Sequence, residues 1–333
     1  CDFVTIESKQ KQDFTGSPLE LLLQITKRVE KQTGTTWAFV ARQFAFSTQT
    51  FSNRQIYIDG SVSSELLDLN LKAAHDSRYD PSTLVAGSIV EFIITSGVLI
   101  SASNTSNYAL TNPNTWPSGV FVRLVIESGA IVAGRGGNGG NGGYDVYPSL
   151  GVNPTVGQNG GISLLSNYPI SINNQGIISG GSGGGGGGGA GRGASLSNFA
   201  FADGLGGGGG WPFGGSGNST LSIIYPVTPL PVAATAANDV TAGLGGIGAT
   251  SLVMYGENQD NSIEVIVGNG GNGGAPYAQN GQAGASASVV VVDIPPISII
   301  QQLGANGGQA GDAIHGQSFI VWENIGTIYG ATT

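Results

Sequence analysis

The chain has 333 residues, a formal net charge of −9 and only 10% charged residues, although 40% of its residues are hydrophobic. The negative charge argues against binding to a nucleic-acid backbone, which needs clustered Lys and Arg. No apolar run approaches the ~20 residues of a membrane-spanning helix. Disordered chains are usually highly charged and poor in Ile, Val and Phe, so the composition favours a folded protein. The single cysteine, Cys1, excludes an internal disulfide, and a chain that begins there without Met is expected to be a segment or a processed product.

Glycine is distributed unevenly along the chain. Of the 58 glycines, only seven precede residue 134. Glycine makes up about 7% of an average protein, so the second part of the chain is far outside the usual range. We therefore expect three domains: an α+β adaptor or attachment module at 1–86, a β domain at 87–133, and a glycine-rich domain at 134–333.

The first module shows one clear helix signal. Ser17-Pro18-Leu19-Glu20 is a capping box with proline at the first helical position, and Thr33-Gly34 ends the apolar pattern that follows. Residues 37–40, 44–46 and 55–58 are typical of strands. A second short helix is expected over 64–74.

The next segment has an all-β pattern. Strands are predicted over 88–94, 98–100 and 120–126, and prolines and glycines around residues 113–119 separate them.

From residue 134 the glycine runs have a period of three, as in 134–143 (GRGGNGGNGG) and 268–274 (GNGGNGG). A polyproline-II helix has three residues per turn and no internal hydrogen bonds, so Gly-Gly-X leaves two faces as bare backbone that neighbouring helices can approach. Because ordering glycine costs more entropy than ordering other residues, we expect nearly every backbone group to be paired. A flexible linker would contain Ser, Glu or Lys and would not alternate with strands. Collagen needs Gly-X-Y with abundant Pro.

An internal repeat joins these runs to the strands before them. Three segments share a hydrophobic residue four positions before a glycine and another two positions after it. The glycines are Gly129, Gly176 and Gly326, and the flanking pairs are Val125 and Ile131, Ile172 and Ile178, and Trp322 and Ile328. The predicted fold is therefore mainly β with an irregular glycine-rich region: a small α+β module, a β segment, and a polyglycine-II helix bundle capped by short strands.

Catalytic and metal-binding motifs are weak in this sequence. Residues 180–184 fit the Gly-x-Ser-x-Gly pattern of hydrolases, but no strand–turn–helix pattern surrounds them. The two histidines, His75 and His315, have no second ligand at metal-binding spacing, and we expect His75 on the surface. Residues 307–312 are a near miss to a calcium-binding repeat. Depolymerases place paired carboxylates on long β-solenoids, whereas Asp and Glu are few and scattered here. No enzyme activity, cofactor or metal is predicted.

Aromatic residues gather in the connections between glycine runs, at 144–147, 199–201 and 211–213 and at Tyr277. Aromatic side chains in loops on a rigid scaffold give a large contact area at low entropy cost, which favours a recognition surface. The alternative is that they cap the ends of the bundle as hydrophobic covers.

The second and third parts of the chain resemble the receptor-binding region of tailed-bacteriophage tail-tip and tail-fibre proteins. That group includes the glycine-rich long-tail-fibre adhesins, whose core is a polyglycine-II sandwich. The resemblance covers residues 85–333. It rests on 115–120 (TWPSGV), 124–126 (LVI), 134–140, 172–178 (INNQGII), 311–322 (GDAIHGQSFIVW) and 326–331 (GTIYGA).

The resemblance implies a virion protein at the extracellular tail tip that recognises a bacterial surface receptor, whether protein, polysaccharide or pilus, during host attachment. It also implies other tail or baseplate proteins as partners and a homotrimer. Receptor-binding candidates carried over from such adhesins are Tyr144, Asp145, Tyr147, Phe199, Phe201, Trp211, Phe213 and Tyr277. The alternatives are a purely structural tail-tip or filament component, which would not bind host envelopes, and a bacterial surface adhesin.

Overall fold

The computed structural model describes residues 53–63, 66–146, 149–194, 199–219, 227–228, 232–244, 250–255, 261–292 and 298–333. The chain divides into two compact units, Cys1–Gln49 and Thr50–Thr333, and the described residues belong to the second. The helix expected from Ser17 to Gly34 and the strands expected at 37–40 and 44–46 lie outside them. The described chain is mainly β, as predicted. Among its helices, none has the length and apolar character needed to cross a membrane.

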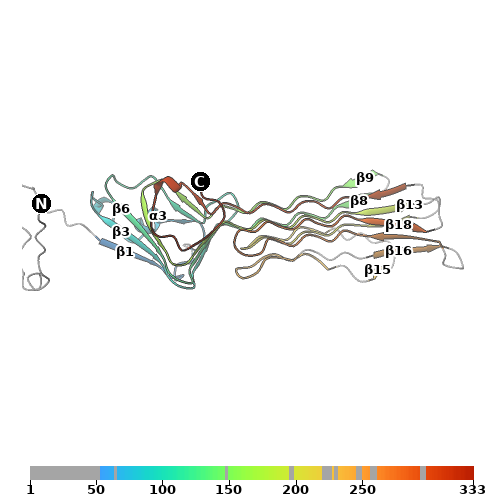
Figure 1. The fold of residues 1–333 in the computed structure, drawn as a ribbon, viewed down its shortest axis with the longest axis horizontal. Helices are drawn as coiled ribbons and strands as arrows, with labels where there is room; N and C mark the ends of the chain where they lie inside the picture. The colour runs from blue at the N-terminus through green and yellow to red at the C-terminus, as the bar shows by residue number, and fades with distance from the viewer. Residues whose placement is uncertain are drawn as a thin grey trace, which may run out of the picture. The chain divides into compact units, whose positions relative to one another are not determined.

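Three parallel sheets form a solenoid, which Figure 1 shows around the labelled strands β1, β3 and β6. The first sheet has the order β1 (Asn53–Ile58), β3 (Ile89–Ile94), β6 (Phe121–Ile126), β11 (Ile170–Asn174) and β21 (Ile320–Asn324). The second contains β4 (Leu99–Ser101), β7 (Ile131–Ala133), β12 (Ile177–Ser179) and β22 (Thr327–Tyr329). The third contains β2 (Leu69–Asn70), β5 (Leu110–Asn112), β10 (Leu164–Ser166) and β20 (Ile314–His315).

Each coil of the solenoid visits the three sheets in turn. The second coil is β3, β4 and β5, and the following coils repeat the order with parallel, in-register pairing. In the first coil the second sheet is reduced to a single bridge between Leu67 and Ser101. β1, which precedes residue 87, therefore belongs to the same sheets as the strands of 87–133.

Inward-facing side chains stack from coil to coil and form the main core. The residues of two such stacks are at most 1% exposed in the first four coils. These stacks are Ile56, Phe92, Leu124 and Ile172 in the first sheet, and Ile100, Val132 and Ile178 in the second. Because each buried side chain of this size contributes about 1.5–3 kcal/mol, the stacks account for a large part of the stability of the solenoid.

A short helix, α3 (Leu71–Asp76), follows β2 and begins later than the helix expected over 64–74. Asn70 caps it by accepting a hydrogen bond from the Ala73 N–H at 3.0 Å, and Asp68 just before it has a positive φ of 53°, which is not helical. The helix buries Leu71, Ala74 and His75. The short 3₁₀ turns η2 (Pro81–Thr83) and η3 (Gln317–Phe319) precede β3 and β21.

The glycine-rich segments are insertions at one corner of the solenoid. Residues 134–163 separate β7 from β10, and residues 180–313 separate β12 from β20. In the second coil, the same corner lies between β4 and β5 and contains only residues 102–109. The inserted segments run out to a set of short antiparallel strands, return toward the solenoid, and reverse direction beside it at 211–213, 239–240 and 276–278 (Figure 1).

Neighbouring glycine segments bond to each other through their backbones at every third residue. In the central segment, 180–190, Gly181, Gly184 and Gly187 donate to carbonyls of 155–161. The residues that follow each of these, Ser182, Gly185 and Gly188, donate to carbonyls of 205–211. The third set, Gly183, Gly186 and Gly189, donates to carbonyls of 279–285, and all nine N···O distances are 2.7–3.1 Å. The same segment accepts bonds, again at every third residue, from 137–143, 268–274 and 305–311. Its backbone is therefore bonded to six neighbours.

The three segments of the predicted internal repeat do pair with one another in the sheets, but the predicted alignment of the first segment is off by one residue at each position. Ile178 pairs with Ile328 and Ile172 with Trp322, as aligned. However, Ile172 pairs with Leu124 instead of Val125, and Ile178 pairs with Val132 instead of Ile131. The reason is the corner between the first two sheets, which takes residues 127–130 in one coil and only 175–176 in the next.

Candidate functional site

Short antiparallel strands gather at the end of the glycine segments that lies away from the solenoid, and we call this group the tip (Figure 1). One sheet has the order β14 (Phe199–Ala202), β13 (Gly191–Ala194), β19 (Ser298–Gln301). A second has the order β15 (Val227–Thr228), β16 (Thr250–Tyr255), β17 (Asn261–Ile266), β18 (Ser288–Val292). A hairpin of β8 (Tyr144–Val146) and β9 (Ser149–Val152) lies against β13 and β14.

The tip has a small core of its own, separate from that of the solenoid. Ala202, Val265, Val267 and Val289 are buried between its two larger sheets. Gln302 fastens the hairpin to the bundle, because its side-chain oxygen accepts from the Ala190 N–H at 3.1 Å while its side-chain nitrogen donates to a carbonyl of β9 at 3.2 Å. The tip strands therefore have fixed positions on the glycine segments.

Four connections of at most five residues join tip strands directly, namely residues 147–148, 195–198, 256–260 and 293–297. They lie outside the described residues, and we call them the tip connections. Loops carried by rigid elements are where binding residues concentrate in proteins, so the strands that the connections join define a candidate recognition surface.

The sequence-predicted candidates do not all lie at the tip. Tyr144 and Asp145 belong to β8, and Phe199 and Phe201 belong to β14. Tyr144 is half-buried. Tyr147, in the first tip connection, lies outside the described residues.

Trp211, Phe213 and Tyr277 lie at the opposite end of the bundle, beside the solenoid, where segments reverse direction toward the tip. Trp211 is 1% exposed, its indole N–H donates to the Asp239 carbonyl at 2.9 Å, and its ring centroid lies 5.3 Å from that of Tyr277. Tyr277 in turn stacks on Tyr329 of β22 at 4.9 Å. The guanidinium of Arg135 sits 5.5 Å from the ring centre of Phe213. These contacts fit the alternative role of the aromatics as hydrophobic covers of a bundle end.

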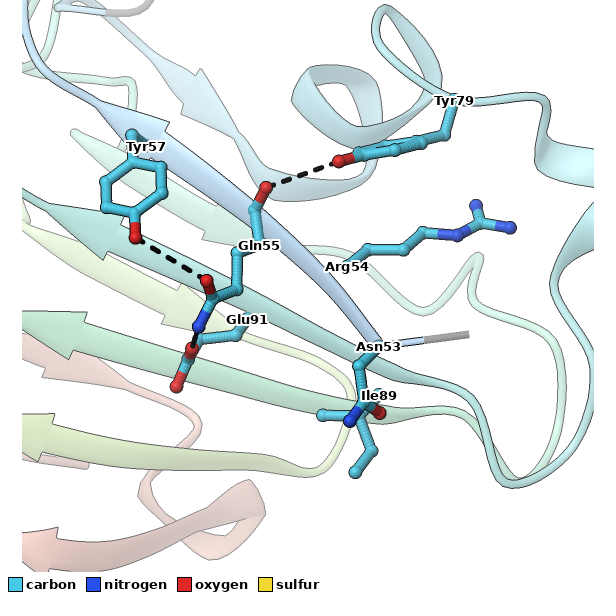
Figure 2. A pocket seen from close by; sticks show the side chains of 7 residues that line it. All are labelled: Asn53, Arg54, Gln55, Tyr57, Tyr79, Ile89 and Glu91. Carbon is cyan, nitrogen blue, oxygen red and sulfur yellow. Dashed lines mark hydrogen bonds between the residues drawn. The ribbon is translucent and has the colours of Figure 1, made fainter. Parts of the chain in front are cut away.

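A hollow of about 580 Å³ lies beside β1, on the first coil of the solenoid (Figure 2). Its lining residues are Asn53, Arg54, Gln55, Tyr57, Tyr79, Ile89 and Glu91. The Tyr79 hydroxyl donates to the Gln55 carbonyl at 3.3 Å, and the Gln55 side chain donates to Glu91 at 2.6 Å. The groups that meet here are amides, aromatic rings, the Arg54 guanidinium and the Glu91 carboxylate, which is bonded to Gln55 and Arg123.

Beneath this hollow, His75 is fully buried, so its expected surface position is wrong. Its Nε2 lies 2.5 Å from Arg54 Nη1 and its Nδ1 lies 2.8 Å from an Asp76 oxygen. Because Arg can only donate, His75 accepts at Nε2 and donates from Nδ1, which describes the neutral ring. Burial, assisted by Arg54, lowers the pKa of His75 below its usual 6.5, although Asp76 opposes the shift. The sequence contains a signal for this burial, because His75 lies four residues after Leu71 and one after Ala74, on the face of α3 that packs on the core.

The residues that could suggest catalysis are already engaged. The Ser182 hydroxyl, in the hydrolase-like motif, donates to the Ala275 carbonyl at 2.6 Å and accepts from the Gln279 N–H at 3.2 Å. It is buried inside the bundle. Among the described residues, no group of three or more His, Cys, Asp or Glu side chains could hold a metal ion.

The arrangement defines a class of protein: a solenoid base from which a backbone-bonded bundle projects a set of loop-bearing strands. A sequence profile of the family described as "Phage tail fibre adhesin Gp38" matches residues 53–333, and the chain belongs to that family. It is therefore a receptor-binding adhesin of a phage tail fibre and a component of the virion, as the sequence predicted.

The chain is also similar to a chain in the crystal structure of the gp37–gp38 adhesin tip complex of the bacteriophage S16 long tail fibre, with 21% identity and a TM-score of 0.43. The alignment covers 92% of this chain and 97% of that chain. A comparison with curated protein sequences finds no match.

Proposed function

We propose that the chain recognises its bacterial surface receptor through the tip connections, which a polyglycine-II bundle holds at a fixed distance from the solenoid. The observation that carries this proposal is the bonding of segment 180–190 to six neighbours. A bundle bonded in this way positions the tip strands, and thus the ends of every tip connection, without any demand on the sequence of the connections themselves.

The bond pattern supports the polyglycine-II assignment. The donors of the central segment point to three different neighbours in strict rotation, as expected for a helix with three residues per turn. Its glycines have neighbouring backbone where a side chain would begin, since a Cβ built on Gly185 would lie 1.9 Å from the Gly271 carbonyl oxygen. A hexagonal packing of threefold helices accounts for both facts.

The recognition role is non-enzymatic in this proposal. The Ser182 hydroxyl of the hydrolase-like motif is buried and bonded to two backbone groups, which supports a binding role in place of catalysis at that motif. The matching family is described as an adhesin family.

The solenoid is proposed to join the adhesin to other tail proteins. In this arrangement 134–163 and 180–313 supply the bundle and the tip, and 53–133 forms the base together with 164–179 and 314–333, because β1, β3, β6, β11 and β21 share one sheet. The receptor class and a trimeric assembly stay predictions, and sedimentation of the purified chain tests the second.

The test is an adsorption-inhibition assay with purified full chain and variants in which one tip connection is replaced. Exchanging residues 256–260 (GENQD) or 195–198 (SLSN) for Gly-Ser sequences of equal length should abolish inhibition of phage adsorption while leaving the thermal unfolding midpoint unchanged. Phe121→Ser and Val240→Ser, which are 64% and 69% exposed and far from the tip strands, are matched controls that should still inhibit.

The outcomes separate the competing ideas. If tip exchanges bind like the parent chain while Phe213→Ala or Tyr277→Ala does not, the recognition surface lies at the solenoid end of the bundle. If the parent chain itself does not bind host envelopes, the structural-component alternative gains support.

A further inference from the structure

Seven Asn-Gly pairs occur in the glycine segments, and six of the seven asparagines are exposed. They begin at Asn138, Asn141, Asn159, Asn269, Asn272, Asn280 and Asn306. In such a pair the backbone nitrogen of the glycine can attack the side-chain carbon of the asparagine, because a residue without Cβ leaves the approach open. The attack requires a side chain that can turn toward this nitrogen and an N–H that is not engaged elsewhere. The hydrogen bonds of the bundle therefore decide which pairs can react.

In four of the pairs both reacting groups are bonded. The side-chain oxygen of each asparagine accepts a backbone N–H from a neighbouring segment at 2.7–2.9 Å. These bonds join Asn138 to Gly215, Asn141 to Asn218, Asn159 to Gln309, and Asn280 to Ala310. The glycine N–H groups of the same pairs, at Gly139, Gly142, Gly160 and Gly281, donate to backbone carbonyls at 2.8–3.0 Å. A reaction at any of these pairs must first break two bonds. Asn269 and Asn272 also have interaction partners.

The pair Asn306-Gly307 is different. Asn306 is exposed, and among the described residues neither its side chain nor the Gly307 N–H makes a hydrogen bond. Its carbonyl accepts from the Gly157 N–H at 3.0 Å, so the backbone of Asn306 is held while its side chain is left to rotate. Both groups that the attack needs are therefore available in the folded chain.

The neighbouring segment explains why this N–H has no partner. Segment 279–287 runs beside 302–311 and offers side-chain acceptors to it at a spacing of three residues. The Asn280 side-chain oxygen accepts from the Ala310 N–H at 2.8 Å, and the Ser286 hydroxyl accepts from the Gly304 N–H at 3.2 Å. The position midway between them is Ala283, which stands opposite Gly307 in this register and has no polar side-chain atom.

We propose that Asn306 is the deamidation site of the folded bundle. The Gly307 nitrogen, after losing its proton to hydroxide, bonds to the side-chain carbon of Asn306. The bond between that carbon and the side-chain nitrogen breaks, and the nitrogen takes a proton from water and leaves as ammonia. Water then opens the resulting five-membered imide at either carbonyl and yields aspartate or isoaspartate. Solvent supplies every reactant outside the chain, so the reaction requires no enzyme.

Isoaspartate at this position would disturb the bundle. It routes the chain through the side-chain carbon and so adds one backbone atom between Ala305 and Gly308, whose N–H groups donate to the central segment at 2.9 and 2.7 Å. A helix with three residues per turn cannot keep both bonds in register across an extra atom. Aspartate adds only a charge at an exposed position. The isoaspartate product should therefore loosen the segment from its neighbours.

The first experiment incubates the full chain in mildly alkaline buffer and maps its peptides by mass spectrometry. In the folded parent chain Asn306 should convert at least about tenfold faster than Asn159 or Asn280, because those two react only after local opening of the bundle. In denaturant the three should convert at similar rates, since each is followed by glycine. Equal rates at Asn306 and Asn159 in the folded chain would overturn the proposal.

The second experiment restores the missing acceptor. Ala283→Thr places a hydroxyl opposite Gly307, and Ala283→Val is the matched control because it has the same shape without an acceptor. The threonine variant should slow conversion of Asn306 at least about threefold, since its N–H must then be released first, and the valine variant should react like the parent chain. Parental conversion in the threonine variant, or equal slowing by valine, would show that the missing acceptor is not the cause.

Ageing of the folded chain tests the consequence. The thermal unfolding midpoint of the parent chain should fall as isoaspartate accumulates at Asn306, whereas Asn306→Gln, which keeps the amide but disfavours the five-membered ring, should hold its midpoint over the same time. An equal fall in both chains would mean that modification of Asn306 does not loosen the bundle.

Discussion

The solenoid and the glycine bundle reach an ordered state by opposite means. The solenoid buries side chains such as Leu124 and Ile172, and its strands are bonded in register. The bundle has almost nothing to bury, because segment 180–190 contains only glycine apart from Ser182 and Ala190, and its order rests on backbone bonds to six neighbours. One region should therefore be sensitive to the loss of side-chain atoms and the other to their gain.

The largest effect is expected from adding one methyl group at the centre of the bundle. In Gly185→Ala the new Cβ would lie 1.9 Å from the Gly271 carbonyl oxygen, which is backbone and cannot turn aside. The loss of unfolding free energy should exceed the ~3 kcal/mol that overpacking a core usually costs. Chemical denaturation measures it. Gly215→Ala is the matched control, because its Cβ would meet only the end of the Asn138 side chain, at 3.1 Å. Equal destabilisation by both variants would contradict the bundle model.

The mirror experiment removes side-chain atoms from the solenoid. Leu124 is fully buried in a stack that continues above and below it, so Leu124→Ala should cost about 2–5 kcal/mol through lost transfer energy and a residual cavity. Phe121→Ala on the same strand removes more atoms from a position that is 64% exposed and should change stability by less than about 0.5 kcal/mol. Should the two variants unfold at the same denaturant concentration, side-chain burial would not be what holds the solenoid.

The glycine-rich segments carry a local sequence signal, whereas the solenoid does not. The period of three in 134–143 is a local signal, and the backbone bonds repeat at that period. The solenoid depends instead on pairing between strands such as β12 and β22, which the inserted segment 180–313 separates in sequence. No local pattern indicates which distant strand will be the partner. The register of Ile172 with Leu124 instead of Val125 has a different cause, because the corner between the first two sheets is two residues longer in one coil than in the next.

The candidate site was predicted only in part for a geometric reason. Aromatic residues occur in connections at both ends of the bundle, and the sequence does not show at which end a given connection lies. That depends on the number of times the chain has reversed. Trp211 and Tyr277 lie in turns at the solenoid end of the bundle, whereas Phe201 lies in β14 at the tip.

A smaller effect should appear in the pH dependence of the first coil. Neutral His75 is bonded to Arg54 and Asp76, with Lys72 and Tyr79 also packed around it, and burial lowers its pKa in the folded protein. The unfolded chain, with a histidine pKa near 6.5, therefore binds the extra proton first, and stability should fall as pH drops below 6.5. His75→Gln should flatten this slope, whereas His315→Gln should leave it in place. A slope that persists in His75→Gln would assign it to other groups.

The smallest effect concerns the row of charges that crosses the solenoid from Glu91 to Glu323. Hydrogen bonds from Arg123 and then Ser171 lower the pKa of Glu323 to about 2, against 4.5 for a free glutamate. Because the folded pKa is the lower one, the stabilisation is present above pH 4.5 and is lost as pH falls from 4.5 toward 2. The Glu323 side chain is 35% exposed, so the contribution should stay below about 1 kcal/mol.

Glu323→Gln should reduce the slope of unfolding free energy against pH in that window, and added salt should reduce it in the parent chain as well, because partly exposed pairs are screened. The variant also tests how the last coil is held. If its slope matches that of the parent chain, the Glu323–Arg123 pair adds nothing measurable, and β21 is held by its backbone pairing with β11 and by the packing of Trp322 on the core. The last coil would then be held as the other coils are, by paired strands and inward side chains.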